Sequence, residues 1–430
     1  MFNLKIENIN DYINSKLMKR YQISIDNLMG KINLKLLEGS DMMGWLDLVD
    51  SYDNHEIIQM HNKAREWKKM DIKYVLVIGI GGSYVGVRAV TDMCCGVFDD
   101  STPQLIWVHN ISSSYIVPLM KKLEHEKFAI IVISKSGTTL EPAISFRIFR
   151  ELLQKNVGIS KLHKYIVAIT DKTKGTLHDF AKHRHITTFS IPDDVGGRFS
   201  TLTPVGMFVI ILKGLDPLMI LKGARQAIKD TSDNDISENT AFTYACYRHY
   251  FAMVKHLQIE NFIVYDPSLQ FVGEMWRQIF GESEGKEGKG IFPSLSLFTT
   301  DLHSMGQYLQ QGTRNFFQTT LIVKKPKNDM LIKILDNNDK LKYLNNKSLD
   351  FINKKAFEGT IAAHTKVGQT NNFIIEIGRD DEYHFGYLFM WFAIAVTISG
   401  YLLKINPFNQ PGVEQYKNNM FKLLGKKNFK

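Results

Sequence analysis

Uninterrupted apolar runs recur along the first half of the chain, with stretches of helical periodicity between them. A run that is apolar at every position predicts a strand buried on both faces, as in a parallel sheet covered by helices on either side. We therefore expect residues 66–215 to form a doubly wound α/β domain. Its expected strands are Tyr74–Ile78, Leu105–His109, Phe128–Ile133 and Tyr165–Ile169.

Apolar runs again alternate with stretches of helical periodicity in residues 216–405, and this pattern predicts a second doubly wound domain. Residues 1–65 predict a helical arm with charged faces, and residues 406–430 a closing amphipathic helix. Two domains with appended helices also fit the length, because 430 residues exceed what one ordinary core accommodates. The clearest strands of the second domain are Phe262–Tyr265, Thr319–Lys325 and Phe373–Ile377.

The segment Phe385–Leu403 carries no charge and is long enough to cross a bilayer. It contains two glycines together with Thr397 and Ser399, and a polar, proline-containing segment follows it. We interpret it as a fully buried helix, in the domain core or at a subunit interface, and expect no membrane contact.

Composition narrows the class of protein. Hydrophobic residues make up 44% of the chain, as in a globular protein. The three cysteines have no CxxC spacing and the N-terminus has no apolar signal region, which favours a cytoplasmic protein without disulfides or a zinc site. The net charge of +9 is accompanied by no nucleic-acid motif, so we expect small anionic molecules as partners and no nucleic acid.

The first expected strand leads into a glycine-rich loop, Gly79–Val90. A dinucleotide-binding fingerprint requires a third glycine where Tyr84 stands, and an acid where the second strand ends in Asn110. We therefore reject the NAD interpretation. The loop still resembles a phosphate or polyol cradle, in which Gly82 and Ser83 offer backbone N–H groups and a hydroxyl at a helix start.

A second cradle follows the strand Phe128–Ile133 directly, as SKSGTT. A purely structural alternative is a hydroxyl-rich helix N-cap. Four hydroxyls, a glycine and a lysine at one strand-to-helix turn nevertheless favour an anion-binding nest. The candidate ligand-binding residues are Ser134, Lys135, Ser136, Thr138 and Thr139.

Two further segments carry candidate chemistry. In VGGRFS, Gly197 allows close backbone approach and Arg198 supplies a planar donor for an anionic oxygen, although a turn with a surface arginine is the alternative. In the segment Trp276–Gln307, Gln278 and Glu282 are four residues apart and share a face if the helix reaches Glu282. A carboxylate at a helix end beside glycines suits a proton-transfer base, whereas a solvated acidic turn is the alternative.

Taken together, GIGGSYVG, SKSGTT, VGGRFS, GESEGK, DLHSMGQ and NPFNQPGVEQYK resemble the phosphoglucose isomerase family, and most closely its compact bacterial form. The resemblance covers residues 70–425. It implies two sugar-isomerase (SIS) domains of three α/β/α layers, with the N-terminal arm and C-terminal helix belonging to the second. One departure is the segment Ala363–Asn372, where the family usually has a glycine-containing turn.

The resemblance also implies roles for the candidates. Glu282 corresponds to the base that moves a proton between C1 and C2, and His303 and Lys417 to ring-opening and oxyanion-handling groups. Gly197 and Arg198 would face the C1 end of the sugar. Gln278 would help to orient it, and Lys286 would be structural. Gly82, Ser83 and the SKSGTT residues would hold the sugar and its phosphate.

The implied activity is interconversion of glucose 6-phosphate and fructose 6-phosphate through a cis-enediol(ate), in glycolysis and gluconeogenesis. No cofactor and no metal are implied, and the implied assembly is a homodimer whose subunits share each active site. One alternative is another SIS phosphosugar isomerase, for example one that also accepts mannose 6-phosphate. Another is a sugar-phosphate sensor, which would not require Glu282, His303 and Lys417 together.

Overall fold

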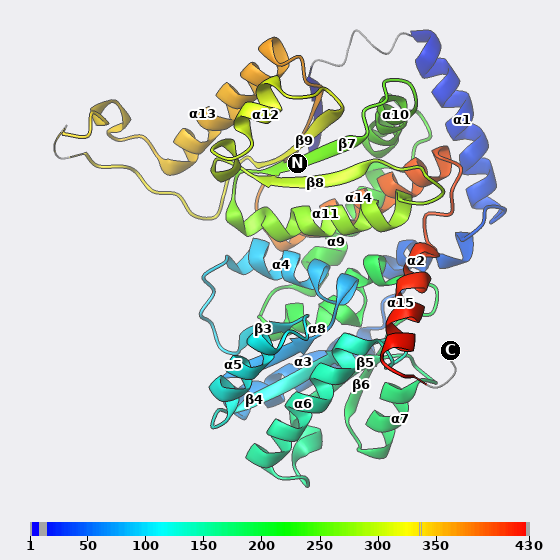
Figure 1. The fold of residues 1–430 in the computed structure, drawn as a ribbon, viewed down its shortest axis with the longest axis vertical. Coiled ribbons are helices and arrows are strands. Elements are labelled where there is room, and N and C mark those ends of the chain that lie inside the picture. The colour runs from blue at the N-terminus through cyan, green and yellow to red at the C-terminus, as the bar shows by residue number, and fades with distance from the viewer. Residues whose placement is uncertain (1, 8–14, 335, 337, 427–430) are drawn as a thin grey trace.

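The protein, described from a computed structural model, contains two five-stranded sheets, one in each half of the molecule (Figure 1). The structure describes residues 2–7, 15–334, 336 and 338–426. Parts of the predicted N-terminal arm (residues 1 and 8–14) and of the C-terminal segment (residues 427–430) lie outside the described residues.

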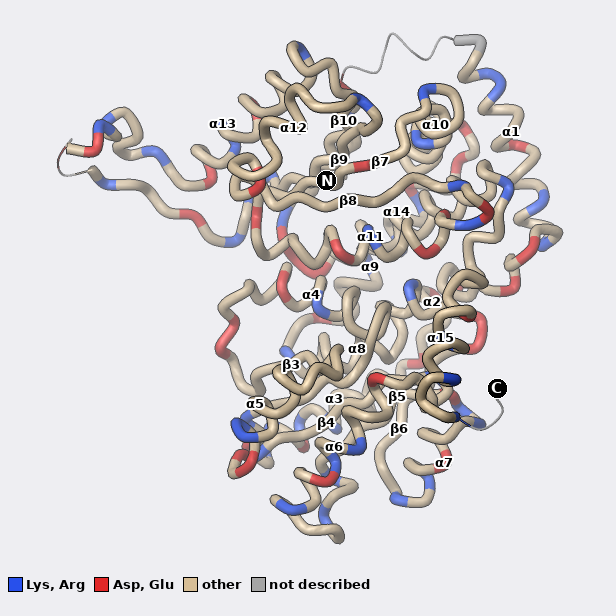
Figure 2. Tube along the Cα trace, viewed as in Figure 1, with Lys and Arg blue, Asp and Glu red and all other residues tan. Residues whose placement is uncertain are grey.

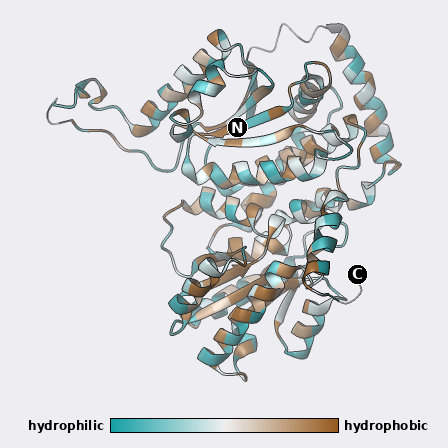
Figure 3. Cartoon of the chain, viewed as in Figure 1, coloured by the Kyte–Doolittle hydropathy of each residue, from teal (hydrophilic) through white to brown (hydrophobic). Residues whose placement is uncertain are grey.

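The first sheet is parallel throughout and has the strand order β3-β2-β4-β5-β6. Alternate residues of β2 enter two different hydrophobic clusters, so helices cover both faces, as the sequence predicts. Figure 3 shows these strands as the brown, apolar layer of the lower half. The strands are β2 (Tyr74–Ile78), β3 (Gln104–Val108), β4 (Phe128–Ile133), β5 (Ile166–Thr170) and β6 (Thr187–Ser190). The flanking helices are α3 (Asn54–Lys69), α4 (Val85–Cys95), α5 (Ser113–Leu123), α6 (Leu140–Val157), α7 (Thr176–His183) and α8 (Pro204–Leu212).

The second sheet has the order β1-β10-β9-β7-β8. Its four later strands are parallel, and helices again pack on both faces. The strands are β1 (Asn3–Glu7), β7 (Ile259–Val264), β8 (Phe292–Leu297), β9 (Phe316–Val323) and β10 (Asn372–Ile377). The helices are α9 (Pro217–Asp230), α10 (Thr240–Met253), α11 (Gln270–Glu284), α12 (Gly306–Gln311), α13 (Leu349–Ala362) and α14 (Glu382–Leu402).

The prediction of wholly parallel sheets and of a purely helical arm is wrong at one edge, because β1 pairs antiparallel with β10. The short segment NLKIE alternates polar and apolar residues, which is the period of a strand with one face against the protein. An ion pair of 2.9 Å between Lys5 Nζ and Glu376 Oε1 joins the two strands.

Helices α1 (Ser15–Asn33), α2 (Gly44–Ser51) and α3 follow β1. Trp45 and Trp67 from this region are fully buried in the main hydrophobic cluster, and α3 packs on α8 of the first half. The proposed domain limits at residues 65/66, 215/216 and 405/406 stay predictions.

The prediction of a fully buried apolar helix is confirmed. α14 is the one described helix long and apolar enough to cross a membrane, but 89% of its apolar window is buried inside the fold. Residues 385–400 are all buried, and α14 packs on α9, α10 and α11. It is therefore the core helix of the second half. Charged residues are spread over both halves around this core (Figure 2).

Candidate active site

Glu282 lies in the last turn of α11, and the helix extends to Glu284. The opposite side of the helix carries the buried side chains of Trp276, Ile279 and Phe280. The face with Gln278 and Glu282 is therefore directed toward the space between the two halves. Gln278 Nε2 donates to Glu282 Oε2 at 3.4 Å, which confirms that the two side chains share a face. The side chain of Glu282 is 33% exposed, so its carboxylate is accessible to a ligand while Gln278 and Arg198 contact it.

Arg198 is buried in the short helix η4 (Gly197–Leu202), so the alternative of a surface arginine is wrong. Its Nε donates to Ser283 Oγ at 2.8 Å, and its Nη2 donates to the carbonyl oxygen of Pro407. Its Nη1 lies 3.5 Å from Glu282 Oε2 and makes no hydrogen bond. Burial lowers the pKa of the guanidinium to about 10 and Glu282 opposes the shift, so the group stays cationic at neutral pH.

The two glycine-containing loops meet beside these residues. A Cβ on Gly82, in η2 (Gly81–Ser83), would lie 1.9 Å from the carbonyl oxygen of Gly197. Gly81 has a φ of +59° and faces Gln278, whose Nε2 would be 3.0 Å from an added Cβ. The loop after β2 therefore touches both η4 and α11, because its glycines leave no side chain between the backbones.

The SKSGTT turn connects β4 to α6. Ser134 is buried, and its Oγ accepts from the backbone N–H of Gly137, whose φ is +74°. Ser136 Oγ and Thr138 Oγ1 are 2.9 Å apart, and these two residues and Thr139 are exposed to solvent. The turn thus presents hydroxyl groups outward while Ser134 fixes its shape.

Lys135 is directed elsewhere. Its Nζ donates to the carbonyl oxygens of Pro192 and Asp193, at 3.1 and 3.0 Å. These contacts tie the turn to the loop that leads to Arg198. In this chain the ammonium group holds the loops together instead of lying free among the hydroxyls.

His303 is exposed, just after η6 (Thr300–Leu302) in the loop following β8. Lys417 lies on α15 (Gly412–Leu423), and its Nζ is 3.2 Å from Glu414 Oε1. The fold therefore brings together Gly82, Gly197, Arg198, Gln278 and Glu282, and among the described residues no hydrogen bond or ion pair links His303 or Lys417 to Glu282 or Arg198.

Sequence reasoning did not single out the contacts that fix the segment before α15. Arg198 holds the carbonyl of Pro407, and Lys286 Nζ donates to the carbonyl of Asn406. Burial, followed by the neighbouring Arg198, lowers the pKa of Lys286 to about 8. The only sequence signal for these partners is their place in the GESEGK and NPFNQPG motifs.

A hollow of about 810 Å³ borders this cluster, a size that suits a small ligand. It is lined by Gly81, Gln278, Glu282, Gly285, Lys289 and Pro293.

The two largely parallel sheets, covered by helices on both faces, give the α/β fold of the sugar-isomerase (SIS) class, and solved structures share this fold. A hypothetical protein from Thermus thermophilus superposes with a TM-score of 0.87 at 25% identity, over 98% of this chain and 100% of that chain. A glucose-6-phosphate isomerase from Chlamydia trachomatis shares the fold, with a TM-score of 0.78 at 20% identity, over 99% and 88% of the two chains.

Sequence comparison gives the family. The phosphoglucose isomerase family model matches residues 38–427. The chain is also 45% identical to the glucose-6-phosphate isomerase of Mycoplasmopsis pulmonis, over 98% of this chain and 99% of the relative. The chain belongs to the phosphoglucose isomerase family.

Proposed function

We propose that this protein interconverts glucose 6-phosphate and fructose 6-phosphate, as an aldose–ketose isomerase of glycolysis and gluconeogenesis. The observation that carries the proposal is the position of Glu282 in a member of this family. Its carboxylate is one-third exposed at the edge of a hollow and lies 3.5 Å from an arginine nitrogen without a hydrogen bond. The relatives in the sequence comparison support the same activity.

In the proposed reaction, the Glu282 carboxylate takes the proton from C2 of the open-chain aldose. The electrons of that bond form the C1–C2 double bond, and the carbonyl oxygen takes up negative charge as the enediolate. A proton passes between the two oxygens, and Glu282 returns its proton to C1, which leaves the carbonyl at C2. One base therefore serves both carbons.

Arg198 suits the charge that develops in this intermediate. Its guanidinium is fixed by Ser283 and Pro407, and Nη1 makes no hydrogen bond. A fixed cation in a buried position stabilises an enediolate without reorganising, which is the main source of electrostatic catalysis. Gln278 would orient Glu282 and the sugar.

The phosphate group would bind at the SKSGTT turn, through the outward hydroxyls of Ser136, Thr138 and Thr139, with Gly82 and Ser83 beside the sugar. Ser134 and Lys135 would support this cradle by holding its shape and its attachment to the Arg198 loop. Binding energy at the phosphate then fixes the reacting carbons near Glu282.

His303 and Lys417 would open the sugar ring and handle its oxygens. Because neither contacts Glu282 within one chain, we propose a cytoplasmic homodimer in which His303 of each subunit completes the site of the other. Lys417 would reach the site through the anchored segment before α15. The proposal requires no cofactor, metal, nucleic acid or membrane.

The test is a coupled assay of the purified protein with fructose 6-phosphate and excess EDTA, in which glucose 6-phosphate formation is followed by NADPH production. We expect turnover of at least the order of 10 s⁻¹, the median for enzymes. Absence of turnover in folded protein would contradict the proposal.

A further inference from the structure

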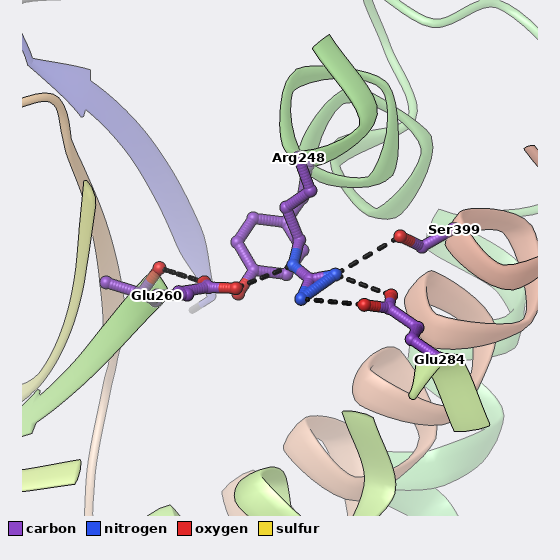
Figure 4. Close-up of polar contacts among 6 residues, drawn as sticks. Arg248, Glu260, Glu284 and Ser399 are labelled. Atoms are coloured by element: carbon purple, nitrogen blue, oxygen red, sulfur yellow. Dashed lines mark hydrogen bonds and ion pairs between the residues drawn. The ribbon is translucent and has the colours of Figure 1, made fainter. Parts of the chain in front are cut away.

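The second half of the protein encloses an ion cluster at the end of α11 (Figure 4). Arg248 of α10 contacts Glu260 of β7 through Nε at 2.7 Å, and Glu284 through Nη1 at 2.6 Å and Nη2 at 3.2 Å. Nη1 also donates to Ser399 Oγ of α14 at 3.1 Å. Arg248, Glu260 and Glu284 each have 0% of the residue surface exposed. We call this group the Arg248 cluster.

Fold stability alone does not explain the Arg248 cluster. Three buried charges are costly to remove from water, and apolar residues of similar volume often give equal or greater stability. The cluster has one cation and two carboxylates, and hydroxyl groups of Tyr244 and Thr319 supply further hydrogen bonds to Glu260. This arrangement fixes the orientation of the Glu284 carboxylate, because two nitrogens of the planar Arg248 guanidinium bind its two oxygens.

Glu284 stands two residues after the candidate base. Each residue of a helix is rotated by about 100° from the one before, so Glu282 and Glu284 point to opposite sides of α11. Ser283 between them accepts from Arg198. The last turn is thus held by Arg248 on its core side and by Arg198 near the hollow, while Glu282 faces the hollow.

The flanks of this turn make such anchors necessary. Gly281 precedes Glu282, and the helix ends at Glu284, followed by Gly285, whose backbone N–H donates to the carbonyl oxygen of Gly281. Glycines in and after a helix lose the most conformational freedom on folding, and the carbonyl groups of a last turn lack helical partners. If Glu284 were not held in the core, the backbone at Glu282 could adopt several conformations.

We propose that the Arg248–Glu284 ion pair is a positioning device for the base Glu282, which sets the rate of proton transfer without touching the substrate. This inference rests on the proposed function and adds two residues to the machinery that supports the site. It also excludes Glu284 as an alternative base, because its carboxylate is buried and paired on the far side of the helix.

The test compares Glu284→Gln with Glu260→Gln. Both variants remove one carboxylate charge from the same buried arginine, but only Glu284 lies on the helix that carries the base. We expect kcat of Glu284→Gln to fall about 10- to 100-fold, since a displacement of about 1 Å at a reacting group costs up to 10² in rate. KM and inhibition by 6-phosphogluconate should stay within about twofold, because the phosphate cradle lies on the other half. Glu260→Gln should keep kcat within about threefold.

Thermal unfolding of both variants separates positioning from stability. A lower Tm with kcat per folded site equal in the two variants would overturn the positioning role, as would a Glu284→Gln enzyme with wild-type kcat. Should Glu284→Gln not fold, Glu284→Asp keeps the charge and withdraws it by one methylene, and the same kcat criterion applies to it. An inactive wild type would instead overturn the proposed function itself, so the two failures are distinguishable.

Discussion

Arg198 Nη1 lies 3.5 Å from Glu282 Oε2, and the same guanidinium donates to Ser283, the next residue of the helix. A single buried arginine therefore contacts both the candidate base and the side chain of the next residue in the helix. This relationship joins the segment after the first sheet to the end of α11.

Glu282→Gln should abolish turnover while leaving the fold and phosphate binding intact. The amide keeps the shape but is not a base, and loss of a general base costs on the order of 10²–10⁴ in rate. The measurement is kcat, together with exchange of the C2 hydrogen with solvent, which should disappear. Glu287→Gln in the exposed loop nearby is the matched control, and turnover within a few-fold of wild type in Glu282→Gln would refute the assignment.

Replacing Ser136 and Thr139 with alanine should mainly weaken binding. Each lost hydrogen bond to a charged phosphate is worth roughly 1.5–3 kcal/mol, so KM and the Kd for 6-phosphogluconate should rise at least tenfold per hydroxyl. Titration calorimetry measures the change, with Ser232→Ala, at an exposed position two residues after the end of α9, as control. Unchanged affinity would place the phosphate elsewhere.

Mixed dimers should test the shared site. Glu282→Gln and His303→Ala subunits are each expected to be nearly inactive alone. If they are refolded together, random pairing makes about half the dimers mixed, and each mixed dimer has one site with both groups, so about a quarter of wild-type activity should return. If native mass spectrometry detects mixed dimers and no activity returns, His303 serves its own subunit.

Gly82→Ala should separate the loops that form the site. The added Cβ would lie 1.9 Å from the Gly197 carbonyl oxygen, so one backbone must move. We expect a loss of about 1–3 kcal/mol in the free energy of unfolding and a drop in kcat/KM. Gly359→Ala is the control, since its Cβ would have no atom within 4 Å and helical alanine is favoured over glycine. Equal behaviour of the two variants would contradict the packing argument.

His364 should make the protein less stable in mild acid. Burial, with a smaller effect of Arg314, lowers the pKa of this imidazole from 6.5 to about 4. The unfolded chain then binds more protons than the native one between these values, so the free energy of unfolding is highest above pH 6.5 and falls as the pH drops toward 4. Denaturant titrations at several pH values measure the free energy of unfolding. In His364→Gln this free energy should depend on pH less steeply than in the wild type, by up to the equivalent of one proton in this range. Parallel slopes would contradict the prediction.

Seven of the ten described strands, the buried helix α14 and the shared face of Gln278 and Glu282 could be predicted from the sequence, whereas the edge strands β1, β6 and β8 could not. The predicted features depend on spacing between near neighbours, where alternation, apolar runs and helical periodicity are direct signals. The family could also be recognised from the sequence, because its motifs are short segments that occur in a fixed order along the chain. The first strand escaped detection because five residues at a sheet edge carry too little periodicity to outweigh the helical pattern that follows.

Tertiary structure alone decided which partner each polar group has. Nothing near Arg198 in the sequence indicates that it is buried against Ser283 and Pro407, and nothing near Glu284 indicates Arg248. The same holds for Lys135, which a local motif places among hydroxyls and the fold ties to the backbone of the next loop. Such pairings join segments far apart in the chain, so they are set by how the two sheets and their helices pack, and by the cost of burying a charge without a partner.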